Sequence, residues 1–257
     1  MDDSVSDVIN RNPLVVPSNT DWTTVRALMR ANKVAQVPSV DESGRVTGLF
    51  LWDELGPKED HDHKMVLMVG GLGTRLRPYT ETCPKPMLEV AGKPMLQHIV
   101  ERARGQGFRN FVFCVNYHAE MIQEFFGNGR QLGVSIEYVQ ENKPLGTAGA
   151  LSLIEAKPHS NFIVSNGDVL TDIDYTELLN FLSLHDAKAV MAVKLHEWTN
   201  PFGVVEMNGL DITGFSEKPV LRSHVNAGVY ALSPETLERV PPGEYCDMPD
   251  VFQTLAA

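Results

Sequence analysis

Apolar runs alternate with amphipathic segments along most of the chain from residue 64 onward. Four short stretches rich in apolar residues predict strands, at residues 65–69, 111–116, 134–139 and 161–165. Apolar residues at helical spacing predict three amphipathic helices between and after these runs, at residues 94–104, 118–126 and 146–156. Alternating strands and helices indicate parallel pairing through right-handed crossovers. This part therefore predicts an α/β fold with a mostly parallel mixed sheet flanked by helices.

The N-terminal part has a different rhythm, with short apolar runs around a single amphipathic segment. The runs predict three strands, at residues 14–16, 34–40 and 46–52. Thr20 or Asp21 is placed to cap a helix whose apolar face carries Val25, Leu28 and Met29. A small α+β unit is expected here, separate from the larger α/β part.

A glycine-rich run, GGLGTRLRP at residues 70–78, directly follows the strand predicted at 65–69, and PKPM follows at 84–87. Glycines allow backbone N–H groups to approach an anion closely. Arg75 and Lys85 add positive charge next to that loop. Because ligands bind beyond the carboxyl ends of parallel strands, the run predicts a phosphate-binding loop.

Two other phosphate-binding motifs are excluded by position. A dinucleotide-binding fingerprint that starts at Gly71 needs a third glycine at position 76, where the chain has Leu76. A Walker loop needs Gly-Lys followed by Ser or Thr, and residues 70–78 lack it. A nicotinamide-dependent dehydrogenase and a P-loop enzyme are both disfavoured.

Asp168 closes the segment Asn166-Gly167-Asp168, which follows the apolar residues 162–164. A carboxylate at a strand end faces the same crevice as the glycine loop. Mg²⁺ binds through one or two carboxylates together with substrate phosphates, so Asp168 is a candidate Mg²⁺ ligand. An Asp in a strand-ending turn is the simpler alternative.

The glycine run and PKPM together resemble the signature of the sugar-phosphate nucleotidyltransferases. These enzymes join a nucleoside triphosphate to a sugar-1-phosphate and release pyrophosphate. The likeness extends over residues 64–250 and implies a Rossmann-like nucleotidyltransferase fold. It implies a Mg²⁺ cofactor on Asp168 and three catalytic residues, Arg75, Lys85 and Asp168. It also implies a set of nucleotide contacts, namely Gly70, Gly71, Gly73, Thr74 and Arg75.

Further segments carry the same resemblance. LGTAG at residues 145–149 matches a family segment that borders the nucleobase, which implies contacts from Gly146 and Thr147. The later segments PFGVV, EKP and NAGVY match the sugar-binding half. They imply sugar-phosphate contacts from Gly203, Glu217, Lys218 and Asn226.

The form of the loop is most similar to mannose-1-phosphate guanylyltransferases, which favours GTP as donor and a hexose-1-phosphate as acceptor. UTP, dTTP and CTP remain alternatives on the same fold. A non-catalytic nucleotide-sensing subunit is a further alternative, because the family's second metal-binding Asp has no counterpart before residue 257. Asp247 and Asp250 are interpreted as a helix start, and we expect the domain to be C-terminally incomplete.

The segment VPSVDESGRVTGL at residues 37–49 resembles one CBS motif, half of a pair. We expect a CBS-like unit at 1–57, a linker at 58–63 and a nucleotidyltransferase domain at 64–257. A CBS unit fused to this transferase type is similar to a branch that acts on glucosamine-1-phosphate. The unit is expected to act structurally, through homo-oligomerisation, or as a ligand sensor. His61-Asp62-His63 is assigned to the linker rather than to a metal site.

Net charge, apolar run length and cysteine content indicate which partners and which cell compartment to expect. The net charge of −11 argues against nonspecific nucleic-acid binding. No apolar run reaches membrane-spanning length, so no membrane partner is expected. Three irregularly spaced cysteines are typical of reduced thiols in a cytoplasmic protein.

Overall fold

The computed structural model describes residues 10, 12–52 and 60–256. The chain divides into two compact units, Met1–Lys58 and Glu59–Ala257. The domain boundary expected between residues 57 and 58 lies outside the described residues, and each unit is described by itself.

The first unit is a three-stranded sheet with one helix. Its elements are β1 (Val16–Pro17), α1 (Trp22–Asn32), β2 (Gln36–Val40) and β3 (Val46–Leu51). β2 pairs in parallel with β1 and antiparallel with β3. Asp21 caps α1, because its carboxylate accepts a hydrogen bond from the Thr24 N–H at 2.9 Å. A small core of Val16, Val25, Met29 and Val37 holds the helix against the sheet.

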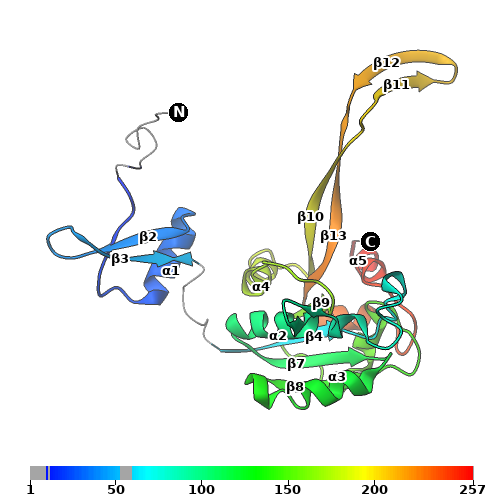
Figure 1. Cartoon of the computed structure of the whole chain (residues 1–257), viewed down its shortest axis with the longest axis horizontal. Helices are drawn as coiled ribbons and strands as arrows, with labels where there is room; N and C mark the ends of the chain where they lie inside the picture. The colour runs from blue at the N-terminus through cyan, green and yellow to red at the C-terminus, as the bar shows by residue number, and fades with distance from the viewer. Residues whose placement is uncertain (1–9, 11, 53–59, 257) are drawn as a thin grey trace. The chain divides into compact units, whose positions relative to one another are not determined.

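The second unit is built on a six-stranded sheet of order β10-β13-β9-β4-β7-β8 (Figure 1). Its strands are β4 (His61–Met68), β7 (Phe108–Val115), β8 (Ser135–Gln140), β9 (Phe162–Asn166), β10 (Ala189–Thr199) and β13 (Val220–Leu232). β9, β4, β7 and β8 are parallel, whereas β13 runs antiparallel to both neighbours. The prediction of a mostly parallel mixed sheet is confirmed.

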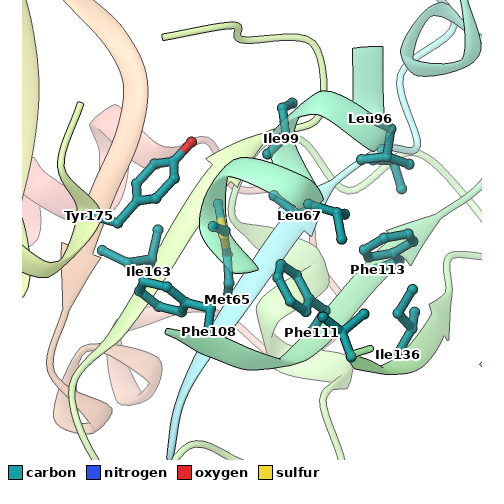
Figure 2. Close-up of a cluster of buried hydrophobic side chains, with 14 of the residues drawn as sticks. Met65, Leu67, Leu96, Ile99, Phe108, Phe111, Phe113, Ile136, Ile163 and Tyr175 are labelled. Carbon is teal, nitrogen blue, oxygen red and sulfur yellow. The ribbon is translucent and has the colours of Figure 1, made fainter. Parts of the chain in front are cut away.

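The central strands of this sheet have buried residues on both faces. Its helices are α2 (Met95–Gly105), α3 (Ala119–Phe126), α4 (Tyr175–Leu184) and α5 (Met248–Ala256). Successive residues of β4 point to opposite faces, so Met65 and Leu67 join a core with α2, α3 and α4 (Figure 2). Val66 joins the core on the other face, which includes residues of α5. None of the helices in the described part of the chain is long and apolar enough to cross a membrane.

The helix predicted at residues 146–156 is wrong. The segment forms only one 3₁₀ stretch, Gly149–Leu153. Gly146 has a left-handed backbone with φ of +79°, and the N–H groups of Ala148 and Gly149 donate to the Cys246 carbonyl. Further along, the Leu151 N–H donates to the Ala148 carbonyl at 2.9 Å, three residues back, so the segment closes 3₁₀ turns rather than α-helical ones. Other 3₁₀ stretches lie at Thr74–Leu76, Lys85–Met87, Arg130–Leu132 and Pro234–Arg239.

The linker predicted through residue 63 is also wrong at its C-terminal end, because β4 already begins at His61. The His61 ring packs edge-on against Phe108, with centroids 4.3 Å apart. The Nδ1 atom of His63 lies within hydrogen-bonding distance, 2.6 Å, of the Asn161 carbonyl oxygen. The side chains of residues 61–64 are polar, so the apolar pattern did not indicate that the strand begins at His61.

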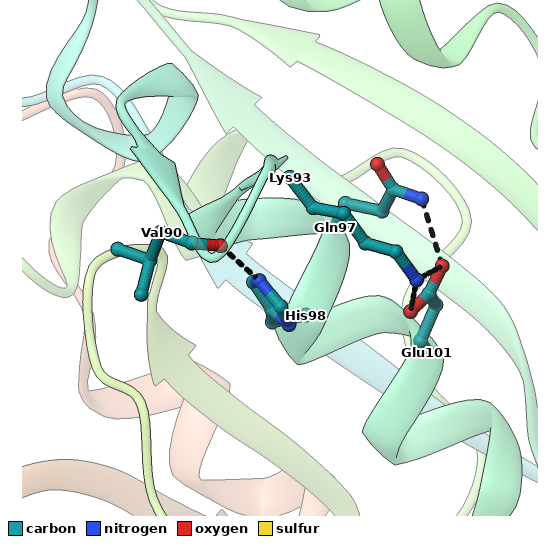
Figure 3. Close-up of polar contacts among 5 residues, drawn as sticks. All are labelled: Val90, Lys93, Gln97, His98 and Glu101. Carbon is teal, nitrogen blue, oxygen red and sulfur yellow. Dashed lines mark hydrogen bonds and ion pairs between the residues drawn. The ribbon is translucent and has the colours of Figure 1, made fainter.

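A short hairpin follows the 3₁₀ stretch Lys85–Met87, called here the Lys85 turn, and is hydrogen-bonded to α2. It consists of β5 (Glu89–Val90) and β6 (Lys93–Pro94). Glu101 on α2 accepts hydrogen bonds from Lys93, with Nζ–Oε2 of 2.8 Å, and from Gln97 (Figure 3). His98 Nε2 lies 2.7 Å from the Val90 carbonyl oxygen. The hairpin thereby fixes the chain that leaves the Lys85 turn.

A long antiparallel ribbon projects from the sheet. β10 and β13 continue beyond their neighbours and lead into a further pair, β11 (Gly203–Asn208) and β12 (Asp211–Glu217) (Figure 1). Gly203 and Glu217, two residues that the family likeness implies for the sugar phosphate, pair with each other on this ribbon.

Replacement of Gly146 by alanine is expected to destabilise the second unit through a specific clash. An ideal Cβ at Gly146 would lie 2.6 Å from the Cys246 carbonyl oxygen. Gly92 is a matched control, because its φ is also +79° and its Cβ would meet nothing within 4 Å. Gly92→Ala should cost about 1 kcal/mol of unfolding free energy, and Gly146→Ala at least about 1 kcal/mol more. Urea unfolding of both variants measures the difference, and equal costs would contradict the tight packing of this loop.

Candidate functional site

A cavity of about 490 Å³ opens at the carboxyl ends of β4 and β9. This volume is in the range of small-ligand sites. Its wall includes residues 68–76, which leave β4, and residues 144–147, which follow β8. Asn166 and Asp168 contribute from the end of β9. The parallel sheet therefore brings together segments that are far apart in sequence.

The glycine loop is packed tightly against the turn that carries Lys85. Gly73 has φ of +60°, and a Cβ there would lie 2.9 Å from Thr80 Cγ2 and 3.2 Å from Lys85 Cβ. The buried Thr80 hydroxyl donates to the Gly73 carbonyl at 2.8 Å. Only glycine tolerates both the positive φ and the close contact with Thr80 and Lys85. The glycine loop and the Lys85 turn are therefore packed together and form one side of the cavity.

Lys85 and Asp168 form an ion pair across the cavity. Their side chains are 32% and 30% exposed, so both remain reachable from solvent. Arg75 lines the same cavity with an exposed side chain. The three residues predicted as catalytic therefore share one site.

The oxygen donors near Asp168 fit a magnesium ion. The Oδ1 atom of Asn166 is buried without a hydrogen-bond partner among the described residues, and Asn166 lines the cavity with Asp168. Mg²⁺ takes few protein ligands and completes its shell with water and phosphate oxygens. No group of three or more acidic, His or Cys ligands occurs in the described ranges, so a protein-only cage is not formed there.

The loop at residues 145–149 is held by a later segment, residues 244–248. Asp247 Oδ1 accepts hydrogen bonds from the Thr147 N–H at 2.9 Å and the Thr147 hydroxyl at 3.0 Å. The Met248 N–H donates to the same hydroxyl at 2.8 Å. Gly146 and Thr147 consequently line the cavity in a fixed conformation.

Glu141 also lines the cavity and was missed by sequence reasoning. Its side chain is buried, and its Oε2 accepts a hydrogen bond from the Leu145 N–H at 3.0 Å. Burial raises the pKa of Glu141. The signal that could have found it is its place directly after β8, since carboxylates at parallel strand ends face the ligand crevice.

Tyr245 and Asp247 are two further cavity residues. The sequence assigned Asp247 to a helix start, and α5 does begin at Met248. Its carboxylate nevertheless turns toward Thr147 and forms part of the wall.

The residues predicted to bind the sugar phosphate lie elsewhere. Gly203 and Glu217 are paired on the β11–β12 ribbon, and Lys218 follows at its end with an exposed side chain. Asn226 lies at the base of the ribbon, lines a second hollow, and donates to the Tyr230 hydroxyl at 2.8 Å. None of these four residues is in the wall of the 490 Å³ cavity.

Comparison with known proteins supports the resemblance. The nucleotidyl transferase family model matches residues 64–248, and the CBS domain model matches residues 5–55. Mannose-1-phosphate guanyltransferase of Schizosaccharomyces pombe is 38% identical over 202 residues, which cover 75% of this chain and 55% of that protein. Probable mannose-1-phosphate guanylyltransferase 2 of Oryza sativa subsp. japonica is 37% identical over 188 residues, with coverages of 69% and 52%. The chain spans about half the length of these curated relatives.

Two solved structures share the fold. A putative glucose-1-phosphate thymidylyltransferase from Bacillus anthracis has a TM-score of 0.55 and 26% identity, covering 68% of this chain and 73% of its own. HddC from Yersinia pseudotuberculosis, complexed with GMP-PN, has a TM-score of 0.53 and 28% identity, with coverages of 71% and 82%. With a matching family model over most of its length and the cavity described above, the chain belongs to the nucleotidyl transferase family.

Proposed function

We propose that the protein transfers a nucleotidyl group from a nucleoside triphosphate, with GTP as donor, to a hexose-1-phosphate and releases pyrophosphate. The observation that carries this proposal is the convergence of the glycine loop, Arg75 and the Lys85–Asp168 pair in one cavity. Nucleotidyl transfer requires backbone N–H groups and cations that bind the phosphates, together with an oxygen ligand for a metal ion. The names of the relatives, mannose-1-phosphate guanyltransferases, agree with this chemistry.

The reaction is an in-line attack by a phosphate oxygen of the sugar-1-phosphate on the α-phosphorus of the triphosphate. The new P–O bond replaces the bond to pyrophosphate, which leaves with its electron pair. Since the nucleophile is already anionic, no strong general base is needed, and positioning with charge neutralisation supplies the catalysis.

The chain's own residues divide these tasks. Backbone N–H groups of the glycine loop hold the triphosphate, and Arg75 neutralises the charge that develops on pyrophosphate. Lys85 exchanges its carboxylate partner for a phosphate oxygen. Asp168 and Asn166 are the residues that would hold Mg²⁺, which supplies charge neutralisation at the phosphates when bound.

Glu141 supports the choice of GTP as donor. A carboxylate accepts hydrogen bonds and, when ionised, donates none. The guanine edge carries two adjacent donors, N1–H and the N2 amino group, which match two carboxylate oxygens. Uracil and thymine carry one such donor between two acceptors. A buried carboxylate beside Gly146 therefore favours guanine.

The acceptor is assigned with support from the family alone. We propose mannose-1-phosphate as the first candidate hexose, from the names of the relatives, and glucosamine-1-phosphate as the second, from the CBS-like unit. Gly203, Glu217, Lys218 and Asn226 are proposed to contact it. We further propose a cytoplasmic setting, which the three free cysteines support, and homo-oligomerisation through the CBS-like unit.

Arg75→Ala is expected to lower kcat for pyrophosphate release by at least ~100-fold, because it removes the cation at the leaving group. The assay follows pyrophosphate from GTP and mannose-1-phosphate in the presence of Mg²⁺. Cys83→Ala is the matched control, since Cys83 is outside the cavity wall and its thiol has no task in the reaction. Near-normal turnover of Arg75→Ala would remove this residue from the mechanism.

Glu141→Gln is expected to weaken GTP binding about 10-fold or more, because the amide offers only one acceptor to the two guanine donors. UTP affinity should change much less. Isothermal titration calorimetry measures both dissociation constants. Glu137→Gln, a surface change on β8 outside the cavity, is the control.

The same residue predicts a pH dependence. Burial raises the pKa of Glu141, so the acceptor form exists above that raised pKa and is lost as the pH falls through it. The ratio of GTP to UTP affinity should therefore fall at low pH, while titration of the triphosphate cancels in the ratio. A pH-independent ratio, or equal losses of GTP and UTP in Glu141→Gln, would reject guanine recognition by Glu141.

A further inference from the structure

Tyr245 is an exposed aromatic residue that is held in place at the wall of the cavity. It is 64% exposed, yet its hydroxyl donates a hydrogen bond to Asp247 Oδ2 at 2.7 Å. Most exposed tyrosines gain little from such a contact, since water satisfies the hydroxyl equally well. A fixed ring beside a ligand cavity offers a flat apolar face that is already positioned.

Asp247 connects this ring to the loop at residues 145–149. One carboxylate oxygen accepts from Tyr245, and the other accepts two hydrogen bonds from Thr147. Burial acts to raise the pKa of Asp247, but the hydrogen bonds from Tyr245 and Thr147 lower it overall, so the carboxylate stays ionised. The hydrogen bond to Asp247 raises the pKa of Tyr245, which keeps its hydroxyl protonated as donor.

The loop does not need Tyr245 for its own conformation. The Cys246 carbonyl already accepts from the N–H groups of Ala148 and Gly149, and the Cys246 N–H donates to the Leu145 carbonyl at 3.0 Å. The bond between Tyr245 and Asp247 is separate from these backbone contacts. Its effect is on the ring itself, whose rotation it restricts.

We propose that Tyr245 contacts the face of the bound nucleobase and that Asp247 positions its ring. This inference rests on the proposed function, because it requires a nucleotide whose base lies beside Gly146 and Thr147. Glu141 would then read the edge of the base, while Tyr245 covers its face. Aromatic rings stack on nucleobases of any sequence, so Tyr245 would contribute affinity rather than base selectivity.

The test compares a ligand that has a base with one that lacks it. Binding of GTP and of inorganic tripolyphosphate to the complete chain is measured by calorimetry. Tyr245→Ala is expected to weaken GTP about 5- to 100-fold and to leave tripolyphosphate unchanged. Tyr245→Phe keeps the ring and should lose only a small part of the GTP affinity. Tyr79→Ala is the control, since Tyr79 is 74% exposed and follows the glycine loop outside the cavity wall.

The positioning role of Asp247 is tested by a double-mutant cycle. Asp247→Asn keeps an oxygen for Thr147 and alters the contact to Tyr245, so it should weaken GTP binding only while Tyr245 is present. An equal loss for both ligands in Tyr245→Ala would mean a structural role and overturn the inference, as would unchanged GTP affinity. Wild-type protein that binds tripolyphosphate but not GTP would reject the proposed donor as well.

Discussion

The site depends on one constraint, the pairing of β4 on both of its edges. β4 lies between β7 and β9 in parallel register, and its alternating side chains fill two cores at once. The strand can shift neither sideways nor by one residue without exposing apolar groups. Its carboxyl end is thus firmly fixed in the unit. The glycine loop leaves from that point, and Asp168 follows the neighbouring strand.

Sequence patterns were sufficient where one physical cause dominated. Buried parallel strands are continuous apolar runs, so β4, β7 and β9 were found from such runs, whereas the edge strand β8 was found from alternating apolar residues. The glycine loop and Asp168 were found because both follow such runs directly. The pattern failed at residues 146–156, where small apolar residues at helical spacing pack against the sheet without forming an α-helix. The loop there is held instead by residues 246 and 247, which lie 100 residues away from Thr147 in the case of Asp247 and so give no local sequence signal.

Glu141 and Tyr245 show a different limit of sequence reasoning. Neither belongs to a glycine-rich or charged motif, and each would be an ordinary surface residue in another context. Their significance comes from neighbours supplied by the fold: the Leu145 N–H for Glu141, and the carboxylate of Asp247 for Tyr245. The sugar-binding residues present the opposite case. They were named from family likeness, and three of them lie on a ribbon outside the cavity wall, so their role stays a prediction.

The fastening of residues 145–149 by residues 244–248 also sets an order on folding. Synthesis delivers the glycine loop first and the loop at residues 145–149 next. Asp247, which holds Thr147 in that loop, follows it only 100 residues later. Long-range contacts of this kind form after local ones, because the intervening chain must first be ordered. The nascent chain therefore completes its central strands before it has a finished cavity. Any ligand of this cavity therefore meets its finished binding site only after those strands are in place.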